Sequence, residues 1–153
     1  VNNTLPRAWF VNKTEVVSEE DVWNKIMQPD FDPRNIAYVP NEVSVSSGSQ
    51  VSITHFEKSI HRITMSTESD GNHFLVLSEV FYPLRWKAKI DGEEMQTHIV
   101  NGILRGVVVP TGKHTIEFIY DKSAFNKGLT ISFVSFVMAL GFIGLGYFGN
   151  KKS

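Results

Sequence analysis

The stretch "WKAKIDGEEMQTHIVNGILRGVVVPTGKHTIEFIY", residues 86–120, decides the fold, because three turn signals divide it into short, partly apolar runs. The Asp-Gly pair at 91–92 and the Asn-Gly pair at 101–102 are strong hairpin signals, since both residue types tolerate the positive φ angles of a two-residue turn. Pro-Thr-Gly at 110–112 is a third turn signal. The runs between these turns predict four consecutive strands in one antiparallel sheet.

Further strand patterns precede this stretch. Residues 8–17 mix apolar and polar side chains, residues 50–57 alternate, and residues 59–69 place their apolar side chains on one face. Residues 73–81 are almost wholly apolar, which is typical of a central strand. Together with the four later strands, these patterns predict a small antiparallel β-sandwich.

One short helix is expected near the N-terminus. After an acidic first turn, Trp23, Ile26 and Met27 supply an apolar face, and Pro29 ends the pattern. Residues 29–42 contain three prolines and are expected to form a loop. The predicted fold class is therefore mainly β with one short N-terminal helix.

The C-terminal stretch "LTISFVSFVMALGFIGLGYF", residues 129–148, contains no charged residue. A helix of 20 residues rises about 30 Å, which matches the hydrocarbon thickness of a bilayer. The alternative is a buried core helix, but such a helix in a small domain would carry a polar stripe. A single transmembrane helix is predicted, between a domain at 1–128 and a short tail at 149–153.

The charge distribution predicts the orientation in the membrane. All 16 acidic residues and 13 of the 15 basic residues precede the apolar stretch, whereas Lys151 and Lys152 follow it. By the positive-inside rule, the tail is cytoplasmic and residues 1–128 are extracytoplasmic, at a bacterial cytoplasmic membrane. A nucleic-acid partner is not expected, because that would need a basic face. The absence of cysteine fits such a location. Because no export element precedes Val1, we expect either a removed signal or a longer polytopic chain.

Few residues suit catalysis or metal binding. No cysteine or Gly-x-Ser-x-Gly motif offers a nucleophile, and the carboxylates near residues 91–94 are explained by a turn and a strand start. We therefore expect no catalytic residue, metal or cofactor in this chain. The histidines show no spacing typical of a zinc site: His55, His61, His73, His98 and His114.

An aromatic corner before residue 86 is the strongest candidate for ligand contact. Tyr82, Arg85 and Trp86 are residue types that stack on sugar faces and bind hydroxyl groups. The alternative for Trp86 is a core position, since it begins a predicted strand. Glu79 and Arg105 lie in otherwise apolar strands, where they would either pair with each other or contact a ligand.

The segments "LSEVFYPLRWKAKIDGEEM" (77–95) and "NGILRGVVVPTGKHTIEFIYDKSAF" (101–125) resemble the C-terminal region of the YfhO-like family of large bacterial membrane proteins. Segment 5–11 and the closing membrane helix resemble that family too. Departures are Phe81 for a usual Tyr, Leu84-Arg85 for a single Gly, and Gly106 for Ala. The matching positions are Ser78, Glu79, Tyr82, Pro83, Trp86, Asp91, Gly92, Asn101, Gly102, Arg105, Pro110, Gly112 and His114.

This resemblance implies a multi-spanning glycosyltransferase that uses lipid-linked sugars and decorates cell-envelope polymers. Its catalytic acids would lie near the first membrane helices, which this sequence does not contain. The chain would then be a non-catalytic accessory domain with its anchor, in contact with the lipid bilayer and with an envelope glycan as the candidate ligand.

The alternative is a single-pass subunit that stabilises a larger bacterial membrane complex, for example an energy-transducing one. Both interpretations require the membrane helix to pack against other transmembrane helices. A stripe of mostly small residues would allow their close approach: Gly128, Ser132, Ser135, Ala139, Phe142 and Gly146.

Overall fold

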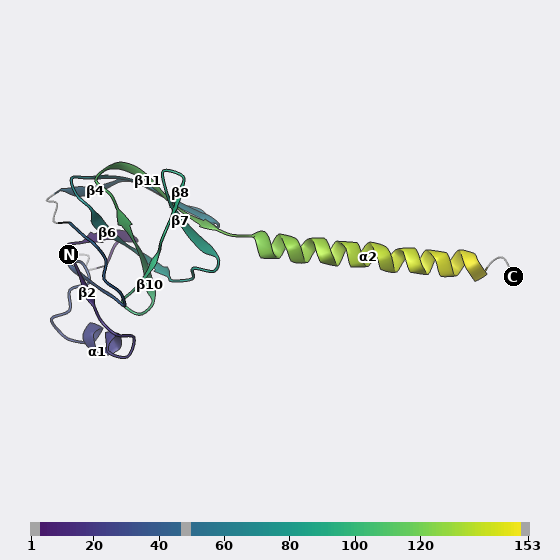
Figure 1. Cartoon of the computed structure of the whole chain (residues 1–153), viewed down its shortest axis with the longest axis horizontal. Helices are drawn as coiled ribbons and strands as arrows, with labels where there is room; N and C mark the ends of the chain where they lie inside the picture. The colour runs from purple at the N-terminus through teal and green to yellow at the C-terminus, as the bar shows by residue number, and fades with distance from the viewer. Residues whose placement is uncertain (1–3, 47–49, 151–153) are drawn as a thin grey trace. The chain divides into compact units, whose positions relative to one another are not determined.

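The computed structural model describes residues 4–46 and 50–150, apart from the side chains of residues 124 and 144–150. The chain divides into two compact units, of which the first ends at Tyr120 and the second begins at Asp121. Antiparallel sheets make up most of the first unit, and one long helix makes up most of the second (Figure 1). The predicted fold class is confirmed.

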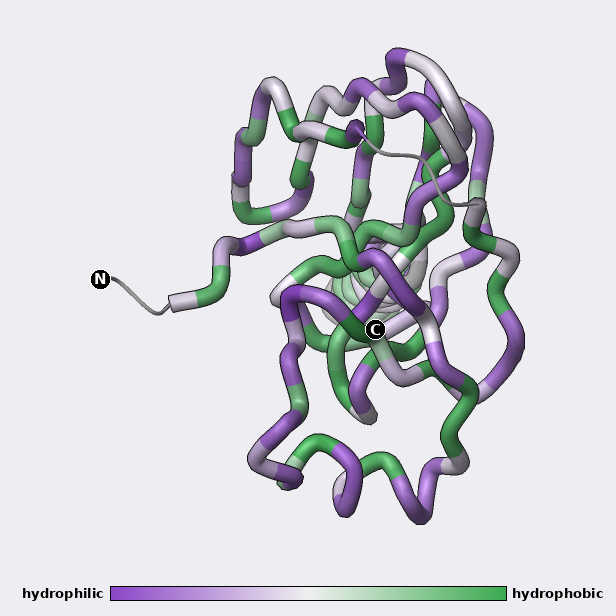
Figure 2. The backbone as a smooth tube through the Cα atoms, turned by 90° about the vertical axis from the view of Figure 1, so that its left-hand side faces the viewer, coloured by the Kyte–Doolittle hydropathy of each residue, from purple (hydrophilic) through white to green (hydrophobic). Residues whose placement is uncertain are grey.

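Two antiparallel sheets pack face to face in the first unit. The four-stranded sheet has the order β1 (Ala8–Val11), β6 (His73–Val80), β10 (Leu104–Val109), β9 (His98–Val100). The five-stranded sheet has the order β4 (Val51–Lys58), β5 (Arg62–Ser69), β11 (Gly112–Tyr120), β7 (Trp86–Ile90), β8 (Glu93–Met95). Figure 2 shows hydrophobic and hydrophilic residues interspersed along the backbone of this unit. Strands β5, β7 and β11 alternate between buried and more exposed positions, so that the five-stranded sheet turns one apolar face to the core between the sheets.

Strand β6 is buried on both faces, which explains its nearly continuous apolar sequence. Leu75 and Leu77 belong to the core between the two sheets. Phe74 and Val76 point to the opposite face of the four-stranded sheet, where a second cluster covers them. That cluster includes Ala37 of β3 (Ile36–Val39), which pairs in parallel with β2 (Lys13–Val16).

The prediction of a single meander over 86–120 is wrong in one respect. Its strands are divided between the two sheets, because β8 pairs with β7 whereas β9 pairs with β10. Met95 packs against the core between the sheets, while Val100 is buried in the second cluster. Each run therefore joins the sheet that buries its own apolar side chains. The tight turn at 91–92 connects two strands of the five-stranded sheet, and the turn at 101–102 connects two strands of the four-stranded sheet.

The loop predicted for residues 29–42 contains a strand that the sequence interpretation missed. Strand β3 lies between Pro33 and Pro40 and pairs with β2, whose Lys13 lies opposite Ile36. Prolines flank the strand but do not interrupt it, so its backbone donors remain available for pairing. Three of its four residues, at 37–39, are buried.

The expected short helix is α1 (Val22–Ile26), which begins later than the acidic run suggests. Ser18 stabilises the preceding turn, where its hydroxyl accepts from the Asp21 amide at 3.2 Å. Val22 is the buried residue of this helix, and it packs with Val17 and Tyr38. Trp23, by contrast, is 52% exposed.

The second unit contains helix α2 (Ser123–Asn150). It starts before the apolar stretch 129–148, since the Asp121 carboxylate accepts hydrogen bonds from both the amide (2.8 Å) and the hydroxyl (3.0 Å) of Ser123. Phe125–Ile143 is long and apolar enough to span a membrane, and no part of it is buried by the protein. Lys151 and Lys152, which set the predicted orientation, lie outside the described residues.

Candidate functional site

The aromatic corner is built by one helical turn in front of β7. The amides of Arg85 and Trp86 both donate to the Tyr82 carbonyl, at 3.2 and 3.0 Å. Trp86 is half-buried, packs against the core between the sheets and lies edge-on to Tyr120, with ring centroids 5.5 Å apart. The core interpretation of Trp86 therefore agrees with the structure.

Arg105 is buried beneath this corner, with 3% of its surface exposed. Its guanidinium carbon lies 4.9 Å from the ring centroid of Trp86 and 5.7 Å from that of Phe118. One terminal nitrogen donates to the Val80 carbonyl at 2.7 Å, while Nε and Nη1 have no hydrogen-bond partner. Burial lowers the pKa of the guanidinium, against an opposing influence of Glu79. Contacts with the rings hold Arg105 in place.

The anticipated ion pair between Glu79 and Arg105 is not formed among the described residues. Glu79 instead pairs with Arg7, at 3.5 Å, and with Lys58. These two cations reach Glu79 from outside the core, whereas the Arg105 guanidinium is directed at the aromatic rings. Of the five residues proposed from the sequence, Tyr82 is 47% exposed, Glu79, Arg85 and Trp86 are partly exposed, and Arg105 is buried. Their ligand role stays a prediction.

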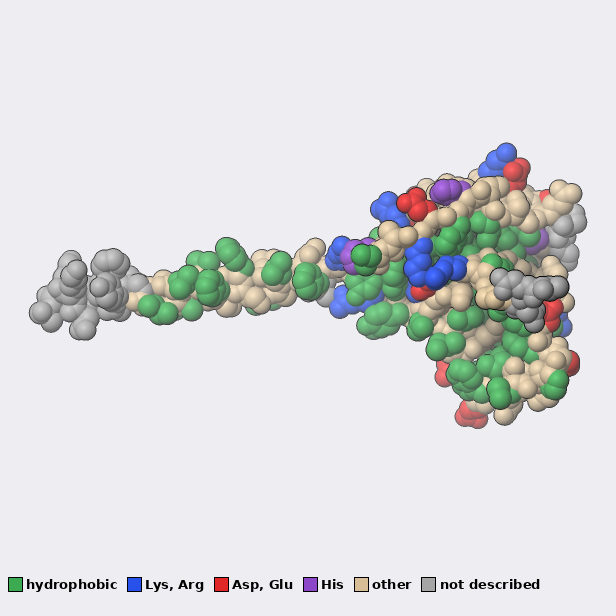
Figure 3. Space-filling model, turned by 180° about the vertical axis from the view of Figure 1, so that it is seen from behind, with side chains coloured by type: hydrophobic (Ala, Val, Ile, Leu, Met, Phe, Trp, Pro, Cys, Tyr) green, Lys and Arg blue, Asp and Glu red, His purple; other side chains and the backbone are tan. Residues whose placement is uncertain are grey.

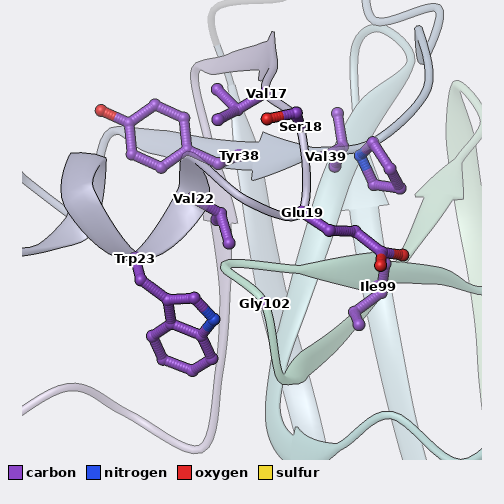
Figure 4. A pocket seen from close by; sticks show the side chains of 10 residues that line it. Val17, Ser18, Glu19, Val22, Trp23, Tyr38, Val39, Ile99 and Gly102 are labelled. Carbon is purple, nitrogen blue, oxygen red and sulfur yellow. The ribbon is translucent and has the colours of Figure 1, made fainter.

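A second site lies beside α1, and the sequence interpretation missed it. We call it the α1 hollow; it has a volume of about 230 Å³. In Figure 4, Trp23 from α1 and Glu19 from the preceding turn are seen on either side of the turn at Gly102. The hollow is lined by Val17, Ser18, Glu19, Val22, Trp23, Tyr38, Val39, Pro40, Ile99 and Gly102.

The turn between β9 and β10 positions Trp23 in this hollow. Asn101 has a positive φ of 49° and is buried, and its side-chain oxygen accepts from the Tyr38 amide at 2.8 Å. Its own amide donates to the Tyr38 carbonyl at 2.9 Å, so that the turn is fixed to β3. Gly102, with φ of 76°, lies directly under the indole, because a Cβ there would be 3.1 Å from Trp23. The sequence interpretation placed Trp23 on the apolar face of the helix, and its exposure appears only in the structure, where Val22 is the buried residue of α1.

The chemistry of the α1 hollow suits a small polar ring. The exposed indole offers an apolar face for stacking. Glu19 contributes a carboxylate and Ser18 a hydroxyl, although that hydroxyl also donates to Asp21 at 2.8 Å. The volume is below the roughly 300–1,000 Å³ of pockets for drug-sized ligands, so a single ring suits it better than a long chain.

His114 and Asp91 form a separate polar pair. Their Nδ1 and Oδ2 atoms are 2.6 Å apart, and Nε2 lies 3.0 Å from the Thr111 carbonyl. Both ring nitrogens thus face acceptors, which favours the imidazolium form. The bond to Asp91 raises the pKa of His114, with a smaller contribution from Thr111, and the same bond lowers the pKa of Asp91. The pair ties the turn after β7 to β11.

Metal ligands do not gather in the described part of the chain. No group of three or more His, Asp and Glu residues there is placed to hold an ion. The sequence contains no cysteine.

Comparison with known families decides where the chain belongs. The model of the family described as "Bacterial membrane protein YfhO" matches residues 28–132, which is more than half of the chain. The chain belongs to the YfhO family. Neither a curated protein nor a solved structure matches it significantly. The match includes the aromatic corner and the turn at Asn101, whereas segment 5–11 lies outside it.

The family is one of bacterial membrane proteins, so the chain is a membrane protein, and α2 has the length and apolar composition of a transmembrane helix. The hydroxyls of Thr130 and Ser135 donate to the carbonyls of Asn126 and Ile131, both at 2.9 Å, which satisfies them within the helix. The described members of the small-residue stripe, from Gly128 to Phe142, are exposed. The surroundings of Gly146 are outside the described residues.

Proposed function

We propose that this chain is a non-catalytic, extracytoplasmic accessory domain with its anchor, belonging to a membrane glycosyltransferase of the YfhO family, and that it contacts an envelope glycan. The observation that carries the proposal is the exposed indole of Trp23 beside the α1 hollow. It supplies a stacking surface on a unit joined to a transmembrane helix. The extracytoplasmic placement rests on the lysines at 151–152.

The α1 hollow has the better case for glycan contact than the aromatic corner. A sugar ring stacked on Trp23 places hydroxyl groups within reach of the Glu19 carboxylate, which accepts hydrogen bonds. At the corner, by contrast, Glu79 is already paired with two cations.

Fluorescence titration of the full chain in lipid nanodiscs tests this proposal. Glucose, galactose and N-acetylglucosamine are added to millimolar concentration. We expect a saturable change in tryptophan emission, because Trp23 is much more exposed than Trp9. Glu19→Gln should weaken binding by roughly tenfold, the equivalent of one charge-assisted hydrogen bond.

Two variants separate the candidate sites, with nuclear magnetic resonance of the sugar as a readout that does not need the indole. Trp23→Ala should abolish binding, and Tyr82→Ala should leave it unchanged. The reverse result would move the contact to Tyr82 and Arg85. No binding of any of these sugars to the unaltered chain would refute the glycan role.

We also infer that α2 packs against another transmembrane helix through the small-residue stripe, in the same polytopic chain or in a complex. This contact is required equally by the alternative function, a single-pass structural subunit. Ala139→Leu enlarges one side chain of the stripe and should weaken association in the membrane, whereas Leu140→Ala, at the neighbouring position, should not. Equal effects of the two substitutions would argue against the stripe.

A further inference from the structure

Three large apolar side chains are exposed on loops at one end of the β-sandwich. Ile60, in the turn between β4 and β5, is 86% exposed, and Leu84, in the loop before β7, is 74% exposed. Tyr82 of the same loop is 47% exposed. We call these three residues the apolar loop surface. Exposed apolar side chains cost free energy in water, and an exposed apolar surface is typical of a site that binds a protein or a membrane.

The end of β11 lies between the two loops. Tyr120, its last residue, is paired with Trp86, which directly follows the Leu84 loop. The Tyr120 amide also donates to the His61 carbonyl at 2.9 Å, in the turn that carries Ile60. In Figure 3, hydrophobic, basic and histidine side chains gather at this end of the unit.

Chain connectivity limits how far this end can be from the lipid. Strand β11 finishes at Tyr120, and α2 begins at Ser123. Three residue steps cover at most roughly 11 Å, and the two helical residues before the apolar span Phe125–Ile143 add roughly 3 Å, whatever the direction of the helix. The polar region on each side of the hydrocarbon core is roughly 5–8 Å deep. The loops that flank Tyr120 are therefore within reach of the bilayer surface once α2 spans it.

We propose that the apolar loop surface inserts into the interfacial region of the bilayer on the side of the β-sandwich. Ile60 and Leu84 enter the boundary between headgroups and acyl chains, and Tyr82 lies at headgroup level, where tyrosine is enriched in membrane proteins. Arg85, which follows Leu84 in the same loop, is partly exposed and meets lipid phosphates.

The charges around the surface favour lipid over a glycan or a second protein. Nearby acids are engaged, since Glu79 pairs with Arg7 and Lys58, and Glu117 with Arg62 at 3.5 Å. Exposed aliphatic side chains next to Arg85, which forms no ion pair with a described residue, fit a surface of apolar chains and anionic headgroups. Only two residues, Asp121 and Lys122, separate β11 from α2, so this surface is close along the chain to the membrane helix.

Single labels can test the insertion, because the sequence has no cysteine. Ile60→Cys and Leu84→Cys are labelled with a nitrobenzoxadiazole dye in the full chain, reconstituted in vesicles of phosphatidylethanolamine and phosphatidylglycerol. Lys113→Cys is the matched control: its side chain is 79% exposed, and it lies on β11 roughly 24 Å before Tyr120.

We expect spin-labelled lipid to quench the dyes at 60 and 84 several-fold more than the dye at 113, and aqueous iodide to show the opposite order. Equal lipid quenching at all three positions would overturn the proposal. Labels at 60 and 84 that are shielded from both quenchers would also overturn it, because they would be covered by protein. Trp23→Ala should leave the pattern unchanged, so that this test is independent of glycan binding.

Discussion

Replacing Gly106 by Ala should destabilise this protein. A Cβ at Gly106 would lie 2.5 and 2.7 Å from two ring atoms of Phe74, and 2.9 Å from a methyl group of Val100. Both neighbours are fully buried, so neither can move aside without disturbing the second cluster. Backbone strain does not contribute to this effect, because Gly106 is not among the residues with positive φ.

The expected magnitude follows from two opposing effects. Overpacking a core costs about 1–3 kcal/mol, and the loss of glycine freedom in the unfolded chain returns about 0.4–1 kcal/mol. The net loss in the free energy of unfolding is about 1–2 kcal/mol, or roughly 4–8 °C in Tm. Phe74→Leu removes the ring atoms that clash, so the double variant should recover at least about 1 kcal/mol relative to additivity.

Thermal unfolding of the full chain in nanodiscs, followed by tryptophan emission, measures this effect, because Trp9, Trp23 and Trp86 all lie in the β-sandwich unit. Gly128→Ala is the control, since a Cβ there meets no atom within 4 Å. A Gly106→Ala variant as stable as the unaltered protein, or a double variant that is merely additive, would refute the packing argument.

Three further predictions concern the polar pair and the aromatic corner. The raised pKa of His114 and the lowered pKa of Asp91 give a stabilisation that is complete between about pH 4 and 6.5, the ordinary pKa values of the two groups. This stabilisation is lost as the pH rises through the folded pKa of His114 or falls through the folded pKa of Asp91. The Tm difference between the unaltered protein and His114→Gln should therefore shrink above neutral pH. A Tm difference that stays constant with pH would contradict the pairing. Arg105→Ala should lower the free energy of unfolding by about 2–4 kcal/mol, because packing on Trp86 and Phe118 is lost. Arg105→Met should lower it by less than half of that amount, because methionine still packs on the rings and the buried charge, which has few hydrogen bonds, is removed. Trp86→Ala should cost about 3–5 kcal/mol and Tyr82→Ala less than about 1 kcal/mol in denaturant unfolding, and similar losses would show that Tyr82 is also structural.

Part of the candidate site was accessible to sequence reasoning, and part was not. The exposure of Tyr82 follows from its place next to Pro83 in a loop, and the packing of the half-buried Trp86 against the core follows from its place at a strand start. The partners of Glu79 could not be predicted, because Arg7 and Lys58 approach it from distant segments of the chain. The α1 hollow also escaped prediction, since it depends on Asn101 binding Tyr38 across 63 residues.

The sequence by itself determined the β-sandwich class, the tight turns at 91–92 and 101–102, and the membrane helix. These features depend on local alternation, on residues that tolerate positive φ, and on an uninterrupted apolar length, all of which are properties of short segments. Only the tertiary structure decided which strand joined which sheet, that β3 exists, and that Phe74 fills the space above Gly106. Those outcomes depend on which distant segments bury each other's apolar side chains. The sequence of a single segment does not determine which of the other segments will pack against it.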